Sequence, residues 1–475
     1  MKTTKTVLDY FYEICAIPHG SGNTGAIADY CVNVAKELGL YVRKDEFNNV
    51  VIKKDASEDK KNCEPIIIQG HLDMVCAKTE DSDFDFLKDG IKCITDGDFI
   101  HAENTTLGAD DGIAVAYALA LVSDDTISHP PLEIILTSDE EIGLIGANKI
   151  DVFDISGKRF INIDSGKEGL FTVSCAGGVR CDLIFESSLD NVSGTLMEVS
   201  VSGLIGGHSG VKIHKRGQNA NKVIGDILNS VCEKFDINIV SVNGGDKENA
   251  IAVYSKAEFI ANASDAELIK NELGNIFSKI KSSSPVDPDI SFDVEIVGEA
   301  SKKAFDKEFS KKVSKALATV KNGVVAMDEN NPGLVKTSLN LGVVSTAENS
   351  IHLAFGLRSN DNNELESLKE EIRIFAESYG ASFETKGAYP AWEYAKDSYL
   401  RDVMCRVYKE KYGKDPEITA IHAGLECGAF AGKLGGIDAV SIGPDMFDVH
   451  TTRERVSISS IERVWEFLKT VMEEL

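Results

Sequence analysis

A histidine and an aspartate follow a short apolar run near the start of the chain. His71 and Asp73 come directly after Ile66-Ile67-Ile68. Because residues two apart on a β-strand lie on the same face, both side chains are expected to leave the strand together. The histidine could bind a metal ion while the carboxylate orients its ring. Taken alone, such a pair is more often a structural polar contact, since buried polar groups commonly satisfy one another.

Further acidic residues stand beside other predicted elements. Asp110 and Asp111 precede an apolar stretch at 112–122. Three acids occupy 139–141 at the predicted start of another helix, and Asp164 follows a further apolar run. One acid is enough to cap a helix N-terminus, so capping does not account for this number of carboxylates. Adjacent carboxylates raise one another's pKa unless a cation neutralises them, so the accumulation favours a metal site.

A second histidine lies near the end of the chain. His450, within 448–454, follows a predicted strand at 439–442. With His71 it provides two imidazoles beside three or four carboxylates, and no thiolate stands among them. Mixed nitrogen and oxygen ligands suit two divalent ions that share a carboxylate. Zn²⁺ is the best fit, and Mn²⁺ or Co²⁺ remain alternatives.

The predicted elements place these residues at the ends of strands in an α/β sheet. Runs rich in β-branched residues alternate with helical patterns, and the strands are predicted at 50–52, 65–68, 132–136 and 160–163. Helices are predicted between and after them at 112–122 and 142–150. Open α/β sheets bind ligands at the carboxyl ends of their strands. We therefore expect a mixed or mostly parallel sheet with the metal site at that edge.

The pattern changes in the middle of the chain. From about residue 187 the strands alternate apolar and polar residues, which predicts a sheet covered on one side only. The α/β pattern returns after about residue 388. The sequence thus predicts a catalytic domain formed by 1–186 and 388–475, interrupted by an inserted α+β domain at 187–387.

Composition excludes several classes of protein. Among 475 residues, 50 Lys and Arg stand against 76 Asp and Glu, a formal net charge of −26 that would repel nucleic acids and anionic membranes. No apolar run reaches the length of about 20 residues that a membrane helix needs. Asp9 and Glu13 interrupt the apolar positions of the N-terminal segment, so no secretion signal is expected. The ten cysteines lack paired spacing, which predicts reduced thiols in a cytoplasmic protein.

Six ordered motifs resemble those of a known enzyme family. HLDMV, TLGADDG, TSDEEIG, INIDSG, GGHSG and DVHTTRE occur in the order and spacing of the di-zinc metallopeptidases that include carnosinase-like dipeptidases, carboxypeptidase G and tripeptide aminopeptidase. LGADDGIAVA and IHAGLECGAF are most similar to a bacterial dipeptidase branch. The resemblance implies a zinc-peptidase-like α/β/α catalytic domain with a mixed sheet, interrupted by an α+β lid domain. It also implies a homodimer formed through the lid.

The same resemblance assigns the ligands of the two metal ions. His71 and Asp164 would bind one zinc ion, Glu141 and His450 would bind the other, and Asp110 would bridge them.

Two further residues of the catalytic domain receive roles from the resemblance. Asp73 would support His71, and Glu140 would be the general base. Glu140 would take a proton from the water that bridges the ions and pass it to the departing amine.

The lid domain would contribute residues that contact the substrate. His208, in the Gly-rich stretch 206–210, would stabilise the tetrahedral oxyanion, although a histidine there could also be a solvated loop residue. Arg358 would hold the substrate's terminal carboxylate by a forked hydrogen bond, or else form a surface salt bridge. Asn219 or Asn221 would contact the substrate too, and the sequence does not choose between them. Lid closure would bring His208 and Arg358 onto the substrate.

A Gly-rich loop near the C-terminus carries two more candidates. His422 and Glu426 stand where the family shapes the pocket near the substrate backbone. Glu426 could bind a free α-amino group, or it could simply be solvated.

The expected function is hydrolysis of unblocked dipeptides, with peptides that end in histidine and carnosine among the substrates. One alternative is an aminoacylase or deacylase of the same family, which acts on N-acyl amino acids. Another is a catalytically silent relative that binds metal or peptide, although it would have little reason to retain Glu140. A di-metal phosphatase fits less well, because phosphate sites usually add Arg or Lys near the ions.

Overall fold

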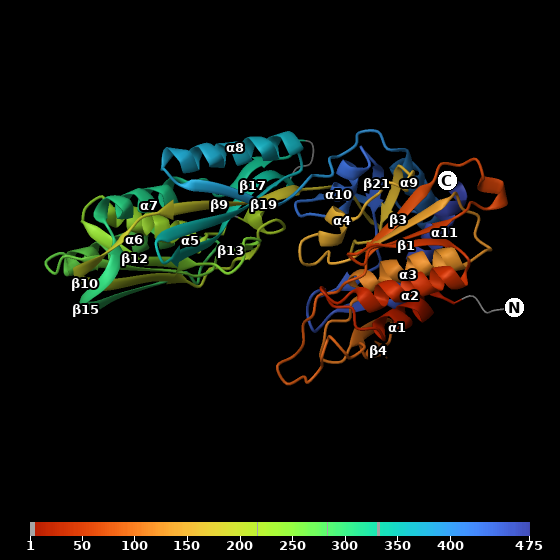
Figure 1. Cartoon of the computed structure of the whole chain (residues 1–475), viewed down its shortest axis with the longest axis horizontal. Helices are drawn as coiled ribbons and strands as arrows, with labels where there is room; N and C mark the ends of the chain where they lie inside the picture. Colours follow the sequence, from red (N-terminus) through yellow and green to blue (C-terminus); the bar gives the residue numbers. More distant parts are fainter. Residues whose placement is uncertain (1–4, 216, 283, 330–332) are drawn as a thin grey trace. The chain divides into compact units, whose positions relative to one another are not determined.

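The computed structural model describes residues 5–215, 217–282, 284–329 and 333–475 (Figure 1). The described residues of Met1–Cys175, Trp392–Ala420 and Leu425–Leu475 form one compact unit. Those of Ala176–Ala391 and Ile421–Gly424 form a second compact unit. Each unit has its own sheet and its own apolar core.

The first unit is built on a mixed sheet of eight strands among the described residues, in the order β1-β2-β6-β3-β7-β21-β8-β20. The strands are β1 (Tyr41–Lys44), β2 (Val50–Lys54), β3 (Ile66–His71), β6 (Leu132–Thr137), β7 (Arg159–Asn162), β8 (Leu170–Cys175), β20 (Glu417–Ile421) and β21 (Asp438–Ser441). β6, β3, β7 and β21 pair in parallel, whereas β1, β2 and β8 pair antiparallel with their neighbours. Every residue of β3 and β6 is buried, as expected of strands covered on both faces. The predicted mixed sheet is confirmed.

Helices complete the first unit. They are α1 (Val7–Cys15), α2 (Gly25–Glu37), α3 (Ala109–Ser123), α4 (Ile145–Lys149), α9 (Tyr399–Tyr412), α10 (Glu426–Lys433) and α11 (Ile458–Glu474). Figure 1 shows α1, α2 and α3 lying together beside the sheet. Nearly the whole of α3 is buried, because its alanine, valine and leucine side chains contact the core on all sides.

A small antiparallel sheet and one short helix remain in the first unit. The sheet has the strand order β22-β23-β5-β4, with β4 (Cys93–Asp96), β5 (Phe99–Ala102), β22 (Met446–Phe447) and β23 (Arg455–Ser457). The 3₁₀ helix is η1 (Glu58–Lys60). The pairing of β5 with β23 joins segments about 350 residues apart, and it places the segment that carries His450 next to the turn that carries Asp110.

The second unit is an antiparallel sheet of nine strands among the described residues. The order is β15-β10-β14-β12-β17-β18-β9-β19, and β16 pairs with β17 off this path. The strands are β9 (Gly177–Glu186), β10 (Leu189–Ser202), β12 (Ile237–Gly244), β14 (Ser255–Ala261), β15 (Ser291–Phe305), β16 (Gly323–Met327), β17 (Val335–Ala347), β18 (Ser350–Ser359) and β19 (Ser382–Tyr389). Figure 1 shows this sheet with α5, α6, α7 and α8 packed along it.

These helices bury one face of the second sheet. They are α5 (Ala220–Cys232), α6 (Ala266–Ser282), α7 (Lys307–Thr319) and α8 (Asn362–Ser378). Their apolar residues share one core with the strands, so the predicted α+β unit with one covered face is observed. A two-stranded ribbon of β11 (Gly207–His208) and β13 (Ala250–Ile251), and the 3₁₀ helix η2 (Ile213–Lys215), complete the unit.

The two units differ from the predicted domain limits at both junctions. β9 lies within the predicted catalytic segment 1–186, but it pairs with β18 and β19 and therefore belongs to the second unit. Ile421–Gly424, predicted to be catalytic, also lies in the second unit. Strand pairing decides the assignment of β9, whereas hydrogen bonds of His422 with Ser338 and Asn360 connect 421–424 to the second unit. Local polarity reports neither.

The helix predicted at 142–150 is shorter than expected. Only Ile145–Lys149 is helical, so the acids at 139–141 lie in a turn and do not begin a helix. Asp139 and Leu144 have φ values of 53° and 56°, a left-handed conformation that a right-handed helix cannot include.

None of the helices formed by the described residues is both long enough and apolar enough to cross a membrane.

Candidate metal centre

His71 is the last residue of β3. Its backbone is held by a hydrogen bond of its own and by close packing at the preceding Gly70. Its N–H donates to Asp111 Oδ2 at 3.0 Å. A Cβ at Gly70 would lie 2.3 Å from Ala114 Cβ and 2.6 Å from Asp111 Oδ2, so only glycine allows α3 to approach the strand this closely. The ring Nδ1 lies 2.9 Å from the backbone oxygen of Asp73. A carbonyl oxygen can only accept, so Nδ1 donates and Nε2 is the atom left for a metal ion.

Asp73 connects the end of β3 to the acidic turn. Its carboxylate accepts hydrogen bonds from Ser21 Oγ at 2.8 Å and from the backbone N–H groups of Glu140 and Glu141 at 2.9 and 3.2 Å. Burial opposes ionisation, but these bonds and the contact with His71 lower the pKa of Asp73. Asp73 was predicted to support His71, and it has a second role as well. It positions the turn that carries Glu140 and Glu141.

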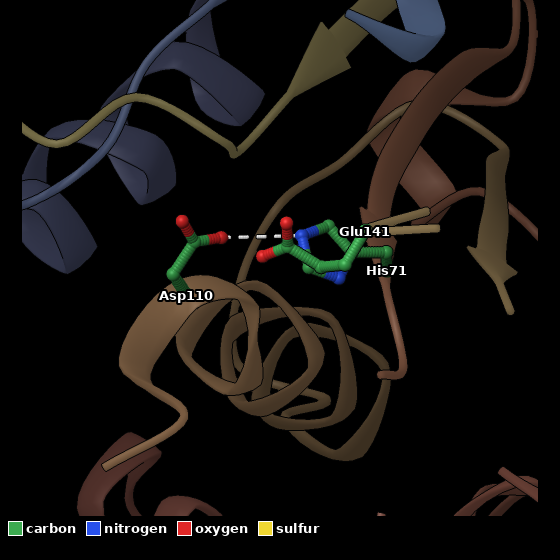
Figure 2. A group of neighbouring side chains, drawn as sticks. All are labelled: His71, Asp110 and Glu141. Carbon is green, nitrogen blue, oxygen red and sulfur yellow. Dashed lines mark hydrogen bonds and ion pairs between the residues drawn. The ribbon is translucent and has the colours of Figure 1, made fainter. Parts of the chain in front are cut away.

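Asp110 lies between the two imidazoles. Its Oδ1 is 3.1 Å from His71 Nε2, and its Oδ2 is 3.2 Å from His450 Nε2. Figure 2 shows the Asp110 carboxylate pointing toward His71 and Glu141. One oxygen facing each imidazole is the arrangement that a bridging carboxylate needs.

Glu141 completes this group from the opposite side. Its Oε1 lies 2.7 Å from His450 Nε2. The same oxygen is buried and accepts no hydrogen bond of good geometry. The contact is an ion pair when the imidazole is protonated, and both atoms can bind a common cation when the imidazole is neutral.

A second group contains Asp164, as predicted, and Asp111, which was not. One ligand atom each from His71, Asp111 and Asp164 lies within 4.8 Å of the others. Asp110 and Asp111 have non-helical backbone angles within the first turn of α3, and Asp111 is buried. The acid pair was visible in the sequence, but only this local backbone shows that both side chains lie near His71.

Burial and mutual repulsion act together on the acids of the cluster. Burial raises the pKa of Asp111 and of Asp164 well above the usual range. Burial and, after it, the charges of Glu426 and Glu141 together raise the pKa of Glu140 to about 8. The cluster therefore disfavours its own ionised form unless positive charge is supplied.

The two imidazoles show the complementary effect. Burial opposes protonation of His71, but its hydrogen bonds with Asp110 and Asp73 raise its pKa well above the usual range. Close contact with Asp110 and Glu141 raises the pKa of His450 to about 10. Protons on the imidazoles and divalent cations are thus alternative sources of the positive charge that this donor set requires, and the donor set fits a pair of such ions.

His208 lies in the ribbon of the second unit, and its tautomer is fixed. Nδ1 accepts hydrogen bonds from the backbone N–H groups of Gly210 and Val211, both at 3.2 Å, so Nε2 carries the proton. A Cβ at Gly210 would lie 2.2 Å from the backbone oxygen of His422, so glycine is required there. Burial, and then the charge of Arg358, lower the pKa of His208 to about 4. His208 is therefore a neutral donor through Nε2 near neutral pH.

Arg358 lies on β18 and is half-buried. Its Nη1 donates to the Tyr389 hydroxyl at 2.9 Å, and its buried Nε has no hydrogen-bond partner. None of the ion pairs formed within the described part of the chain involves Arg358, so the surface salt bridge considered for it is not observed. An unpaired guanidinium of this kind suits a carboxylate ligand.

Asn219 and Asn221 use their side chains for local structure. Asn219 caps α5, because its Oδ1 accepts from the N–H groups of Asn221 and Lys222. Its Nδ2 donates to the backbone oxygen of Leu341 at 3.0 Å, and Asn221 Nδ2 donates to the same oxygen at 3.2 Å. The predicted substrate contact stays a prediction for either residue, and both are buried.

His422 is buried with both ring nitrogens in use. Nε2 lies 2.7 Å from Ser338 Oγ, and Nδ1 lies 3.0 Å from Asn360 Oδ1. Burial, followed by Arg358 and His208, lowers the pKa of His422 to about 3. The ring therefore connects strands of the second unit to 421–424, and it has no free nitrogen for a substrate.

Glu426 is the first residue of α10, and it does not lie in a loop as predicted. It is fully buried in the first unit. Its Oε2 accepts from Thr137 Oγ1 at 2.6 Å and from Gln69 Nε2. Burial raises its pKa to about 7. Oε2 therefore binds side chains of β3 and β6, while the buried Oε1 has no hydrogen-bond partner, and the predicted contact with a substrate amine stays a prediction.

Asp287 is a residue of the second unit that the sequence did not single out. It is fully buried, and its carboxylate accepts the backbone N–H groups of Ile205 at 2.9 Å and Gln218 at 2.6 Å. It therefore anchors both the loop before His208 and the segment before Asn219. No motif surrounds it, so only long-range contacts reveal it.

Comparison with known proteins places this geometry in context. Peptidase family M20/M25/M40 matches residues 67–474. The cytosol non-specific dipeptidase of Escherichia coli K12 is 34% identical over 470 residues, which cover 98% of this chain and 97% of that protein.

Solved structures show the same similarity. The crystal structure of aminoacylhistidine dipeptidase from Vibrio alginolyticus superimposes with a TM-score of 0.88 at 34% identity, and the match covers 99% of this chain and 96% of that one. Aminopeptidase PepT from Bacillus cereus, at 18% identity and a TM-score of 0.57 over 99% of this chain and 98% of that one, shares the fold.

Proposed function

The chain belongs to peptidase family M20/M25/M40, and we propose that it is a metal-dependent dipeptidase that hydrolyses unblocked dipeptides, including peptides that end in histidine. The names of the relatives from Escherichia coli and Vibrio alginolyticus support this substrate class. The observation that carries the proposal is the position of Asp110, with one carboxylate oxygen facing each of two imidazoles.

Two divalent ions, with Zn²⁺ as the best fit, would be held by five side chains. These are His71, Asp110, Glu141, Asp164 and His450. Co²⁺ and Mn²⁺ suit the same nitrogen and oxygen donors. When bound, such ions lower the pKa of water and polarise the scissile carbonyl group. Asp111 would hold the backbone of His71 and help to neutralise the cluster.

Glu140 would be the general base. Its backbone is held by Asp73 at 2.9 Å, while its carboxylate makes no hydrogen bond or ion pair with the described residues. A carboxylate on a fixed backbone with a free side chain can take a proton from the attacking water and deliver it to the departing amine nitrogen.

The second unit would act on charge that develops on the substrate. His208 Nε2–H would donate to the oxygen of the attacked carbonyl, and the Arg358 guanidinium would bind the terminal carboxylate. Asn219 and His422 would contribute by holding the segments around these two residues.

We also propose that the protein works in the cytoplasm as a homodimer formed through the second unit. All ten cysteines are free thiols, which suits a reducing compartment. Among the described residues, the long strand β15 stands at one end of its sheet order and pairs with β10 alone, so its other edge could pair with a second chain. Sedimentation of the purified chain would show whether it is a dimer.

Hydrolysis of a defined panel by purified protein tests the proposal. The panel contains carnosine, Leu-Gly, Gly-His, their N-acetylated forms and one tripeptide, each assayed before chelation, after chelation and after addition of Zn²⁺. An Asp110→Asn variant purified in the same way controls for contaminating peptidases, because it removes one bridging oxygen and leaves the surface unchanged.

Zinc-dependent cleavage of the free dipeptides alone is the expected result. Cleavage of only the acetylated compounds would identify a deacylase and contradict the proposal. Two bound metal ions without any cleavage would identify a binding protein.

A further inference from the structure

Glu454 is a buried carboxylate that binds four consecutive backbone N–H groups. Its Oε2 accepts from Leu107 at 2.8 Å and from Gly108 at 3.1 Å. Its Oε1 accepts from Ala109 at 2.8 Å and from Asp110 at 3.3 Å. The residue is 2% exposed, so these bonds replace its hydration.

The four N–H groups converge because the backbone leaves the helical conformation at this point. Gly108, with φ of 74°, precedes α3 and provides no side-chain cap, while Asp110 and Asp111 have non-helical angles. Successive N–H groups that point to one side form a concave site for an anion. The anion here comes from a residue 344 positions further along the chain.

The segment that carries Glu454 also carries His450. The Glu454 N–H donates to the Thr451 backbone oxygen at 3.1 Å, which closes a tight turn between the two residues. His450 Nε2 lies 3.2 Å from Asp110 Oδ2. The segment 450–454 therefore contacts Asp110 twice, at its backbone through Glu454 and at its side chain through His450.

We propose that Glu454 is a positioning residue that sets the distance between Asp110 and His450, and through it the second metal position of the proposed dipeptidase. Glu454 is not itself a ligand, because each of its oxygens already accepts two N–H groups. It belongs to neither group of neighbouring ligand atoms found among the described residues. The inference rests on the proposed metal pair, but it does not depend on which substrate is cleaved.

Substitution of Glu454 by glutamine is the sharpest test. Glutamine keeps the size of the side chain but replaces one acceptor oxygen with an NH₂ group, which would face two N–H donors. Glu133→Gln is the matched control. Glu133 is also buried in the first unit and accepts the N–H groups of Ser156 and Gly157, at 3.1 and 2.8 Å, in a turn that holds no predicted ligand.

Metal-free wild-type and variant proteins are titrated with Co²⁺, whose absorption spectrum reports ligand geometry, and thermal unfolding is measured in parallel. Loss of a residue that orients metal ligands typically weakens binding about 10–100-fold. We expect Glu454→Gln to weaken the second Co²⁺ by this factor and to change its spectrum. Glu133→Gln should lose thermal stability while both Co²⁺ sites keep their affinity and spectrum.

Other outcomes separate the possible failures. Wild-type affinities and spectra in Glu454→Gln, with only a loss of thermal stability, would show that Glu454 merely stabilises the fold. A wild-type protein that binds only one Co²⁺ would overturn the inference as well. A wild-type protein that binds two Co²⁺ but cleaves no dipeptide would overturn the proposed function alone, because the titrations still test Glu454.

Glu454→Asp serves if the glutamine variant does not fold. Aspartate keeps the charge and both acceptor oxygens, but its shorter side chain would draw 107–110 toward residue 454. We expect it to fold and to bind the second Co²⁺ more weakly than wild type. An unchanged affinity and spectrum in this variant would overturn the inference.

Discussion

Two clusters respond to burial in opposite ways. The acidic cluster of the first unit contains Asp110, Asp111, Glu140, Glu141 and Asp164. The cationic cluster of the second unit contains the charged Arg358 with His208 and His422. In the first, burial raises the pKa of Asp111, Asp164 and Glu140, so each acid resists ionisation. In the second, burial and the charge of Arg358 lower the pKa of His208 and His422, so both imidazoles resist protonation.

This difference shows what each cluster lacks. The acids of the first unit need positive charge, which two cations would supply. The second unit holds an unpaired guanidinium beside a neutral imidazole donor, so it suits negative charge such as a carboxylate or a developing oxyanion. In both units a buried carboxylate accepts backbone N–H groups from a distant loop near the cluster. This residue is Glu454 in the first unit and Asp287 in the second.

The largest expected effect comes from removing the proton acceptor of the acidic cluster without removing a ligand. General-base catalysis contributes about 10²–10⁴-fold, so we expect Glu140→Gln to lower kcat by about 10³-fold. Both metal ions should remain bound, as measured by atomic emission. Glu141→Gln is the control, since it removes a ligand and should lose metal; metal loss from Glu140→Gln would refute the role of Glu140.

In the cationic cluster, removal of the neutral donor should act on the chemical step. Loss of one oxyanion donor costs about 10²–10³-fold in kcat, and we expect this for His208→Ala. The affinity for a substrate-like inhibitor should change far less. His214→Ala removes an exposed histidine close by in the chain and should leave both values unchanged. Equal losses of kcat and affinity in His208→Ala would instead make His208 a binding residue.

Arg358 should act on substrate affinity. A hydrogen bond to a charged group contributes about 1.5–3 kcal/mol, so Arg358→Ala should raise KM for a free dipeptide by about 10–100-fold. The matching dipeptide amide lacks the carboxylate and should show little change. Arg180→Ala, on the neighbouring strand β9, removes an arginine already paired with Asp182 and Glu248. An equal rise of KM for dipeptide and amide would contradict the predicted contact.

The smallest effect concerns stability at low pH. The pKa of His422 is about 3 in the folded chain and about 6.5 when unfolded, so between these values only the unfolded chain binds the proton. The stabilisation is complete above the unfolded pKa and is lost as the pH falls. Between pH 7 and pH 5, wild type should lose about 2 kcal/mol more than His422→Gln in urea unfolding followed by circular dichroism.

The matched comparison for this effect is the exposed His214. His214→Gln should follow wild type over the same pH range. A pH dependence in His422→Gln identical to that of wild type would show that His422 does not contribute.

Elements with one clear apolar face were predictable from the sequence. α9 (Tyr399–Tyr412) is an example, because its apolar residues recur at helical spacing between Ser398 and Gly413, which cap it. The small sheet of β4, β5, β22 and β23 was missed. Its strands are two to four residues long, too short for a periodic pattern, and they pair across most of the chain.

The residues of the candidate site also divide into those that the sequence predicted and those that only the structure revealed. The sequence by itself determined that histidines and acids able to bind metal ions stand in short motifs, and the resemblance of these motifs to those of a known family predicted His71, Asp110, Glu141, Asp164 and His450 as the ligands. Only the tertiary structure decided that Asp111 lies beside His71 and Asp164, that Glu426 is buried, and that Glu454 accepts the backbone N–H of Asp110. The physical reason is that burial and hydrogen bonds between segments hundreds of residues apart depend on how the chain packs, and local spacing carries no record of that packing.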